Sequence, residues 1–123
     1  KAHLSKKEEG SDIFGVERQS GSVAGILNSI RQSFGGKELY PSIEEKAAHL
    51  LYFIIKHHPL IEGNKRIASL LFIFFLSKNN YLLKKNGERK INDNALVALA
   101  LLIAESKPSE KEVMISLVTN LLV

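Results

Sequence analysis

The spacing of apolar and polar residues divides the chain into several helical segments. Val23, Ile26, Leu27, Ile30 and Phe34 recur at intervals of one to four residues, and glycines follow at positions 35 and 36. This periodicity is typical of one face of a helix, and glycine commonly ends one. The first segment therefore predicts a helix from residue 22 to about residue 34.

The second segment has a clear start and a clear end. Ser42 is followed three residues later by Glu45, which is the pattern of a capping box at a helix N-terminus. The helix should continue to about His57, because Pro59 disfavours helical backbone at the residue before it. We therefore expect a helix over residues 43–57.

Two later segments, residues 67–76 and 95–104, are almost wholly apolar and predict helices buried at the centre of the domain. The first should begin near Gly63 or Asn64 and end around residues 78–80, and Asn92 or Asp93 can cap the second. A last amphipathic helix should start near residues 107–110. Its predicted apolar side contains Val113, Leu117, Val118 and Leu121.

The polar segments between these elements predict turns. Residues 37–40 suit an exposed turn or small hairpin, and Asn86-Gly87 suits a hairpin turn or loop. Residues 1–12 are short and charged and are interpreted as a lead-in or linker remnant. The predicted fold class is therefore an all-α helical bundle with a small hairpin, formed by a single domain over residues 13–123.

Composition narrows the function classes. The 123 residues include no cysteine, which leaves neither a disulfide framework nor a cysteine-containing zinc site. The net charge of +4 is scattered, without a basic stripe, so nucleic-acid binding is a weak third hypothesis. No apolar stretch reaches the roughly 20 residues that span a bilayer. The chain begins without methionine, which suits a part excised from a longer protein.

The segment His58-Pro59-Leu60-Ile61-Glu62-Gly63-Asn64-Lys65-Arg66 places dense polar chemistry between two apolar helices. Glycine lets a backbone approach a ligand, and amides at a helix start favour an anion. Two cations at a helix N-terminus are unfavourable unless an anion is bound. This pattern predicts a phosphate site with a histidine beside it that can transfer a proton.

Each residue also has a structural alternative. Glu62 can hold Mg²⁺ or simply precede a helix N-terminus, where negative charge is favoured. Gly63 can be a turn residue and Asn64 a helix cap. His49 and His57 are expected to be structural, because His49 lies within its helix and His57 at the helix C-terminus.

The nine residues resemble the signature of the Fic/Doc family, His-Pro-Phe-x-Asp/Glu-Gly-Asn-Gly/Lys-Arg. The stretch from Leu39 to Leu76 is similar to the Fic-type domain at the end of RhuM-like virulence proteins, and the resemblance as a whole extends from about Phe14 to the end of the chain. The resemblance implies a Fic-type bundle that uses ATP, or another nucleoside triphosphate, and Mg²⁺ to modify a hydroxyl side chain of a protein. It implies a bacterial, cytoplasmic protein, with secretion into a host left open, and a missing N-terminal domain or an antitoxin-like regulator as a partner.

The same resemblance implies a role for each site residue. His58 is the general base, Glu62 binds Mg²⁺, and phosphate is held by residues of the next helix, namely Gly63, Asn64, Lys65, Arg66 and, more weakly, Ser69. A flap would hold the target chain by strand addition. Its residues are Gly36, Lys37, Glu38, Leu39 and Tyr40.

Departures from the signature shape the hypothesis. Leu60 replaces Phe, Lys65 stands where adenylylating members carry glycine, and Ser69 stands where they carry a second arginine. Loss of that cation favours Doc-like transfer of the terminal phosphate over transfer of AMP. The open alternatives are AMP transfer and a degenerate domain that binds a phosphate or a partner. Residues 5–10 match an autoinhibitory pattern superficially, although Ser69 leaves the glutamate without its usual partner.

Overall fold

The computed structural model describes residues 15–31, 33–34 and 37–123. Its order of elements is α1 (Ser22–Ser29), β1 (Ser33–Phe34), β2 (Lys37–Glu38), α2 (Ile43–His57), α3 (Asn64–Lys78), α4 (Asp93–Glu105), the short 3₁₀ helix η3 (Pro108–Glu110) and α5 (Lys111–Leu122). The predicted all-α class is confirmed. Among the described residues, no helix is long and apolar enough to cross a membrane.

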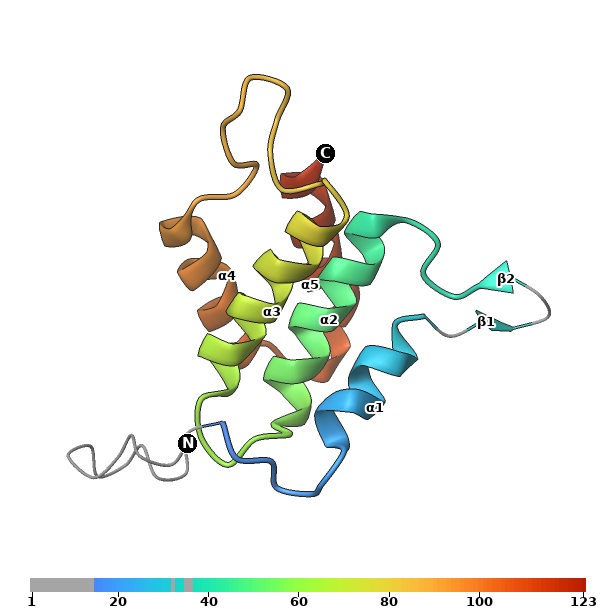
Figure 1. Ribbon diagram of the computed structural model, residues 1–123. Helices are drawn as coiled ribbons and strands as arrows, with labels where there is room; N and C mark the ends of the chain where they lie inside the picture. Colours follow the sequence, from blue (N-terminus) through green and yellow to red (C-terminus); the bar gives the residue numbers. More distant parts are fainter. Residues whose placement is uncertain (1–14, 32, 35–36) are drawn as a thin grey trace.

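Helix α2 is the central element, and α1, α3, α4 and α5 all pack against it (Figure 1). Alanines and aliphatic residues fill the interface and are at most 1 % exposed: Ala47, Ala48, Leu50, Leu51, Ile54 and Ile55. The helix ends beside α3, so both ends of the α2–α3 loop are fixed in a well-packed core.

The predicted helix caps are confirmed at two positions. Ser42 and Glu45 form the capping box of α2, with the Glu45 N–H donating to the Ser42 hydroxyl at 3.1 Å. Asn92 caps α4 by accepting from the Ala95 N–H at 2.8 Å. The predicted turn at Asn86-Gly87 is also present, and an antiparallel bridge joins Leu83 to Arg89 around it.

The first helix is shorter than predicted. It ends at Ser29, and Phe34 lies in β1. Strand β1 pairs antiparallel with β2, with Ser33 opposite Glu38 and Phe34 opposite Lys37. The resulting hairpin projects from the bundle (Figure 1). Pairing with β2 therefore prevailed over the helical spacing of Phe34.

The expectation that α3 and α4 are buried on every side was wrong. Leu70 and Phe74 of α3 are each 60 % exposed, and Val97, Leu101 and Leu102 of α4 are at least half exposed. These helices lie on the outside of α2, so each has one covered side. The predicted apolar side of α5 was also wrong except at Val118. Its buried residues are Met114, Ile115, Val118 and Leu122, while Val113, Leu117 and Leu121 are exposed.

Candidate active site

The candidate site lies in the loop between α2 and α3, at the end of the bundle where the chain also enters α1 (Figure 1). His58 is the C-cap of α2 and has left-handed backbone, with φ 47° and ψ 55°. This conformation costs a residue with a Cβ about 1–2 kcal/mol. It turns the chain sharply, and the His58 side chain is left exposed.

Leu60 anchors the loop in the protein. Its side chain is 2 % exposed, although the residue stands where the family signature has phenylalanine. A buried aliphatic side chain of this size stabilises the loop by about 1.5–3 kcal/mol relative to an exposed one. The replacement of Phe by Leu therefore keeps the loop attached to the core.

Asn64 clamps the same loop from the start of α3. Its Oδ1 accepts from the Leu60 N–H and its Nδ2 donates to the Leu60 carbonyl, both at 2.9 Å. The alternative role of Asn64 as a helix cap was wrong, because the N-cap is Gly63. The side-chain oxygen and one side-chain N–H of Asn64 are therefore engaged by Leu60, and the backbone N–H of Asn64 is one of the first-turn donors of α3.

Helix α3 starts directly at the loop. Gly63 has φ 94° and ψ 14°, a left-handed conformation that favours glycine. The N–H groups of the first turn have no acceptor within the helix and face the loop end. Lys65 and Arg66 lie in this turn and are exposed, as is Glu62 immediately before Gly63. Helix dipole and cations together make this end of α3 favourable for phosphate.

Ser69 lies one turn further along α3 and is half-buried. Its hydroxyl donates to the Lys65 carbonyl at 2.9 Å, which is the usual internal bond of a helical serine. An oxygen engaged in this way brings no positive charge to the site. Its place as a weak phosphate contact stays a prediction.

Residues 15–18, which we call the N-terminal strap, run antiparallel to the site loop. The Gly15 N–H donates to the Glu62 carbonyl at 2.9 Å, and the Ile61 N–H donates to the Val16 carbonyl at 2.8 Å. The Arg18 N–H donates to the Pro59 carbonyl at 2.7 Å, and Arg18 Nε donates to the His58 carbonyl at 2.9 Å. No pattern in the sequence indicates this strap, because three of its four bonds to the loop are made by the backbone alone.

Glu17 joins the strap to α1. Its carboxylate accepts from the N–H groups of Gly21 at 3.0 Å and Val23 at 2.8 Å, at the start of that helix. These bonds lower the pKa of Glu17 below its ordinary value, and the bond from Val23 has the larger effect. Glu17 therefore connects α1 to the strap, and the strap connects to the site loop.

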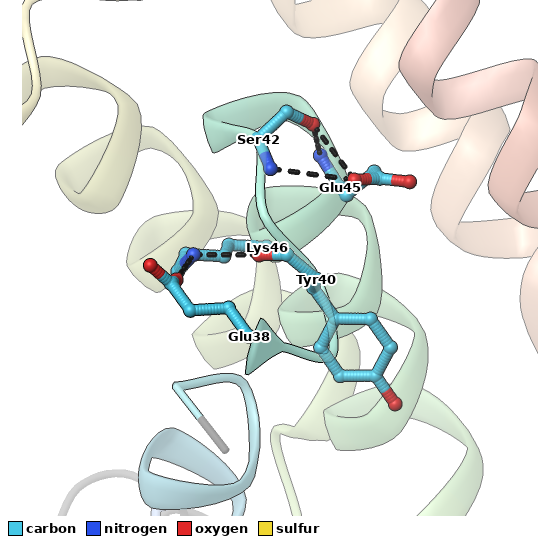
Figure 2. Close-up of polar contacts among 5 residues, drawn as sticks. All are labelled: Glu38, Tyr40, Ser42, Glu45 and Lys46. Atoms are coloured by element: carbon cyan, nitrogen blue, oxygen red, sulfur yellow. Dashed lines mark hydrogen bonds and ion pairs between the residues drawn. The ribbon is translucent and has the colours of Figure 1, made fainter. Parts of the chain in front are cut away.

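The predicted flap is divided between two places. Lys46 of α2 donates to the Glu38 carboxylate and to the Tyr40 carbonyl, while the Tyr40 ring points away from the Lys46 amine (Figure 2). Lys37, Glu38 and Leu39 are exposed, and Tyr40 is half-buried. Gly36 lies outside the described residues, as does the autoinhibitory pattern over residues 5–10.

Tyr40 and Glu38 line different cavities. Tyr40, Phe53 and His57 line one of about 330 Å³ with α1, close to the candidate base. Glu38 and Lys46 line another of about 870 Å³, together with residues near the C-terminus of α3. Lys46 and His58 are separated by roughly 18 Å of helix. Tyr40, which we call the root of the flap, therefore lies toward the site, while Glu38 lies beside the other end of α2.

Glu62 is the residue through which the site could hold Mg²⁺. In the described ranges, no group of three or more histidine, aspartate or glutamate side chains is placed to bind a metal. A single exposed carboxylate nevertheless fits Mg²⁺, which takes one or two carboxylates and completes its shell with phosphate oxygens and water. The donor set therefore suits a metal that arrives with a nucleotide.

Comparison with known proteins adds one finding. The family model described as Fic/DOC family matches residues 2–76, which is more than half of the chain and includes the site loop. No curated protein and no solved structure matches the chain. The match begins within the predicted lead-in, residues 1–12, whose boundary lies outside the described residues and stays a prediction.

Proposed function

Because the chain belongs to the Fic/DOC family, generally a transferase family acting on proteins, we propose that it is a phosphotransferase. It transfers the terminal phosphate of ATP to a serine or threonine hydroxyl of a target protein. The observation that carries the proposal is the site loop itself. A fixed loop presents exposed His58 at the end of α2 and exposed Lys65 and Arg66 at the start of α3. Proton transfer and phosphate binding need this pairing of groups.

In the proposed step, the target hydroxyl oxygen forms a bond to the γ-phosphorus. The bond from that phosphorus to the β–γ bridging oxygen breaks, and ADP leaves. His58 takes the hydroxyl proton, while the first-turn N–H groups of α3, with Lys65 and Arg66, hold the phosphates. Glu62 would hold Mg²⁺, which would supply neutralisation of the phosphate charge.

Two residues favour the terminal phosphate over AMP. Ser69 offers a neutral hydroxyl, itself bonded to the Lys65 carbonyl, where adenylylation would use a second cation. Lys65 adds a charge where adenylylating relatives have glycine. Transfer of AMP remains the second hypothesis, in which the hydroxyl attacks the α-phosphorus and pyrophosphate leaves.

The test uses ATP radiolabelled at the α or the γ phosphate, with Mg²⁺ and a bacterial lysate as the acceptor mixture. We expect protein labelling from γ-labelled ATP only. His58→Ala should abolish it, and His57→Ala is the matched control, because the neighbouring histidine is also exposed. Labelling from α-labelled ATP alone would replace the proposal with AMP transfer.

The same preparations distinguish an enzyme from a degenerate binding domain. Calorimetry with a non-hydrolysable ATP analogue and Mg²⁺ should show binding to the wild type and to His58→Ala, but weaker binding to Arg66→Ala. Binding of the analogue without any labelling would support the degenerate domain instead. Failure to bind it would leave a partner-binding module.

A further inference from the structure

Arg18 is a residue outside the family signature that contacts the backbone of the proposed base. Its N–H donates to the Pro59 carbonyl at 2.7 Å, and its Nε donates to the His58 carbonyl at 2.9 Å across 40 residues of sequence. The two bonds hold consecutive carbonyls. They therefore define the orientation of the peptide unit that follows His58.

The His58 carbonyl lies at the C-terminus of α2, where a helix needs hydrogen-bond donors. The last carbonyls of α2 have no partner within the helix, and a cation near them interacts favourably with the helix dipole. Arginine suits the position, since its guanidinium stays charged and donates in a fixed plane. The left-handed backbone of His58 is uncommon for a residue with a Cβ and persists where its surroundings hold it.

Glu17 and Arg18 bond to different elements. The Glu17 carboxylate bonds to the start of α1, whereas the Arg18 side chain bonds to the site loop. Ser22, the first residue of α1, adds a contact from its hydroxyl to the Pro59 carbonyl at 3.4 Å. The base is therefore braced against α1 as well as attached to α2.

We propose that Arg18 is a positioning residue, which fixes His58 in the orientation that proton transfer requires. This inference rests on the proposed function, in which His58 is the base. Because a misplacement of about 1 Å in a catalytic group can reduce a rate roughly 100-fold, loss of the brace should act on turnover. It should act little on nucleotide affinity, which the proposal assigns to α3.

The activity test compares Arg18→Ala and Arg18→Lys with Arg31→Ala. Arg31 follows α1 and is exposed, but it lines the cavity of about 870 Å³ next to Glu38 rather than the site. In the γ-labelling assay, we expect Arg18→Ala to lower kcat by about 10- to 100-fold with little change in the KM for ATP. Ethylguanidinium should restore part of the loss. Arg18→Lys should fall between, and Arg31→Ala should match the wild type.

An unchanged kcat in Arg18→Ala would overturn the proposal. A rise in KM alone would also do so, because Arg18 would then be a phosphate ligand. Amide hydrogen exchange gives a readout that needs no turnover. In Arg18→Ala, the Ile61 amide, which bonds to Val16, should exchange at least about 10-fold faster, while amides in the middle of α2 keep their rates.

The two readouts separate failure of this inference from failure of the proposed function. If the wild type transfers no label, the proposed function fails, and faster exchange confined to the loop would still show that Arg18 braces it. If the wild type is active and the exchange rates of Ile61 do not differ between wild type and Arg18→Ala, the brace is absent and the inference fails alone.

Discussion

At the scale of single residues, Asn64 shows that a residue of the family signature can have a structural role in the loop. Both functional groups of its side chain bond to Leu60, one as acceptor and one as donor. Aspartate cannot reproduce this pair, because a carboxylate has no N–H to offer. The amide is therefore required for the shape of the loop, whichever group is transferred.

We expect Asn64→Ala to lower the free energy of unfolding by about 1–3 kcal/mol, the net worth of two hydrogen bonds. Asn64→Asp should be at least as damaging, since its charge would face the Leu60 carbonyl. Urea unfolding measures both effects. The matched control is Asn94→Ala, an exposed position in the first turn of α4, where the change should stay within about 0.5 kcal/mol. Equal losses of unfolding free energy in Asn64→Ala and Asn94→Ala would show that the two bonds of Asn64 to Leu60 do not stabilise the protein.

The sequence predicted some site residues because their signals are local. His58 to Arg66 are consecutive, and the predicted helix start near Gly63 or Asn64 is confirmed, so this segment runs from the C-cap of α2 into the first turn of α3. Arg18 could not be predicted, since it reaches His58 from 40 residues away and resembles any exposed arginine in the sequence. The ligand roles of Glu62, Lys65 and Arg66 stay predictions.

At the scale of elements, helix bounds were more predictable than helix faces. The starts of α2 and α4 follow from caps, which involve residues three positions apart. The covered sides of α3, α4 and α5 depend on which neighbours lie beside each helix. Helices α3 and α4 are apolar nearly all round, and α5 has apolar residues outside its covered side as well, so periodicity does not select the covered side. The hairpin likewise depends on pairing between β1 and β2, which overrode the helical spacing of Phe34.

The root of the flap is attached to α2 through a buried histidine, and this attachment should depend on pH. The Tyr40 ring stacks on His49 with 3.8 Å between centroids, and His49 Nδ1 bonds to the Glu45 carbonyl at 2.8 Å. Burial lowers the pKa of His49 below 6.5, and the charge of Lys111 adds to this. The bond to Glu45 and the negative charges of Glu112 and Glu45 oppose the change.

Because the folded pKa of His49 is depressed, its contribution to stability is present above the unfolded value of about 6.5. It is lost as the pH falls through the folded pKa. We expect the free energy of unfolding to decrease over this range in the wild type, and the decrease to be smaller in His49→Gln. Urea unfolding at a series of pH values measures it, with His57→Gln as the matched control. The same slope in His49→Gln and wild type would assign the pH dependence to other groups.

At the scale of the whole molecule, the site depends on α2 being held from several sides. Lys56 lies two residues before His58, and its amine donates to the Ser106 carbonyl at 2.6 Å and the Ala104 carbonyl at 3.4 Å. These carbonyls lie at the C-terminus of α4, where a cation is favoured. Lys56 therefore joins the end of α2 that carries the site to the turn before η3 and α5.

We expect Lys56→Met to keep the apolar stem of the side chain and to lose both bonds. The free energy of unfolding should fall by about 1 kcal/mol, because the amine is half-buried and solvent partly compensates. For a chain of this length, the melting temperature should fall by about 3–6 °C. Lys84→Met, in the exposed loop before α4, should leave both quantities nearly unchanged.

The same variant tests whether the contact of Lys56 with α4 and the contact of Arg18 with His58 act independently. Lys56 bonds to the C-terminus of α4, whereas the orientation of His58 is assigned to Arg18. Well below its melting temperature, Lys56→Met should therefore retain γ-label transfer close to that of the wild type, although it is less stable. A loss of kcat as large as that expected for Arg18→Ala would mean that the site is positioned by the packing of α2 as a whole. Hydrogen exchange at the C-terminus of α4 should then rise together with exchange at Ile61.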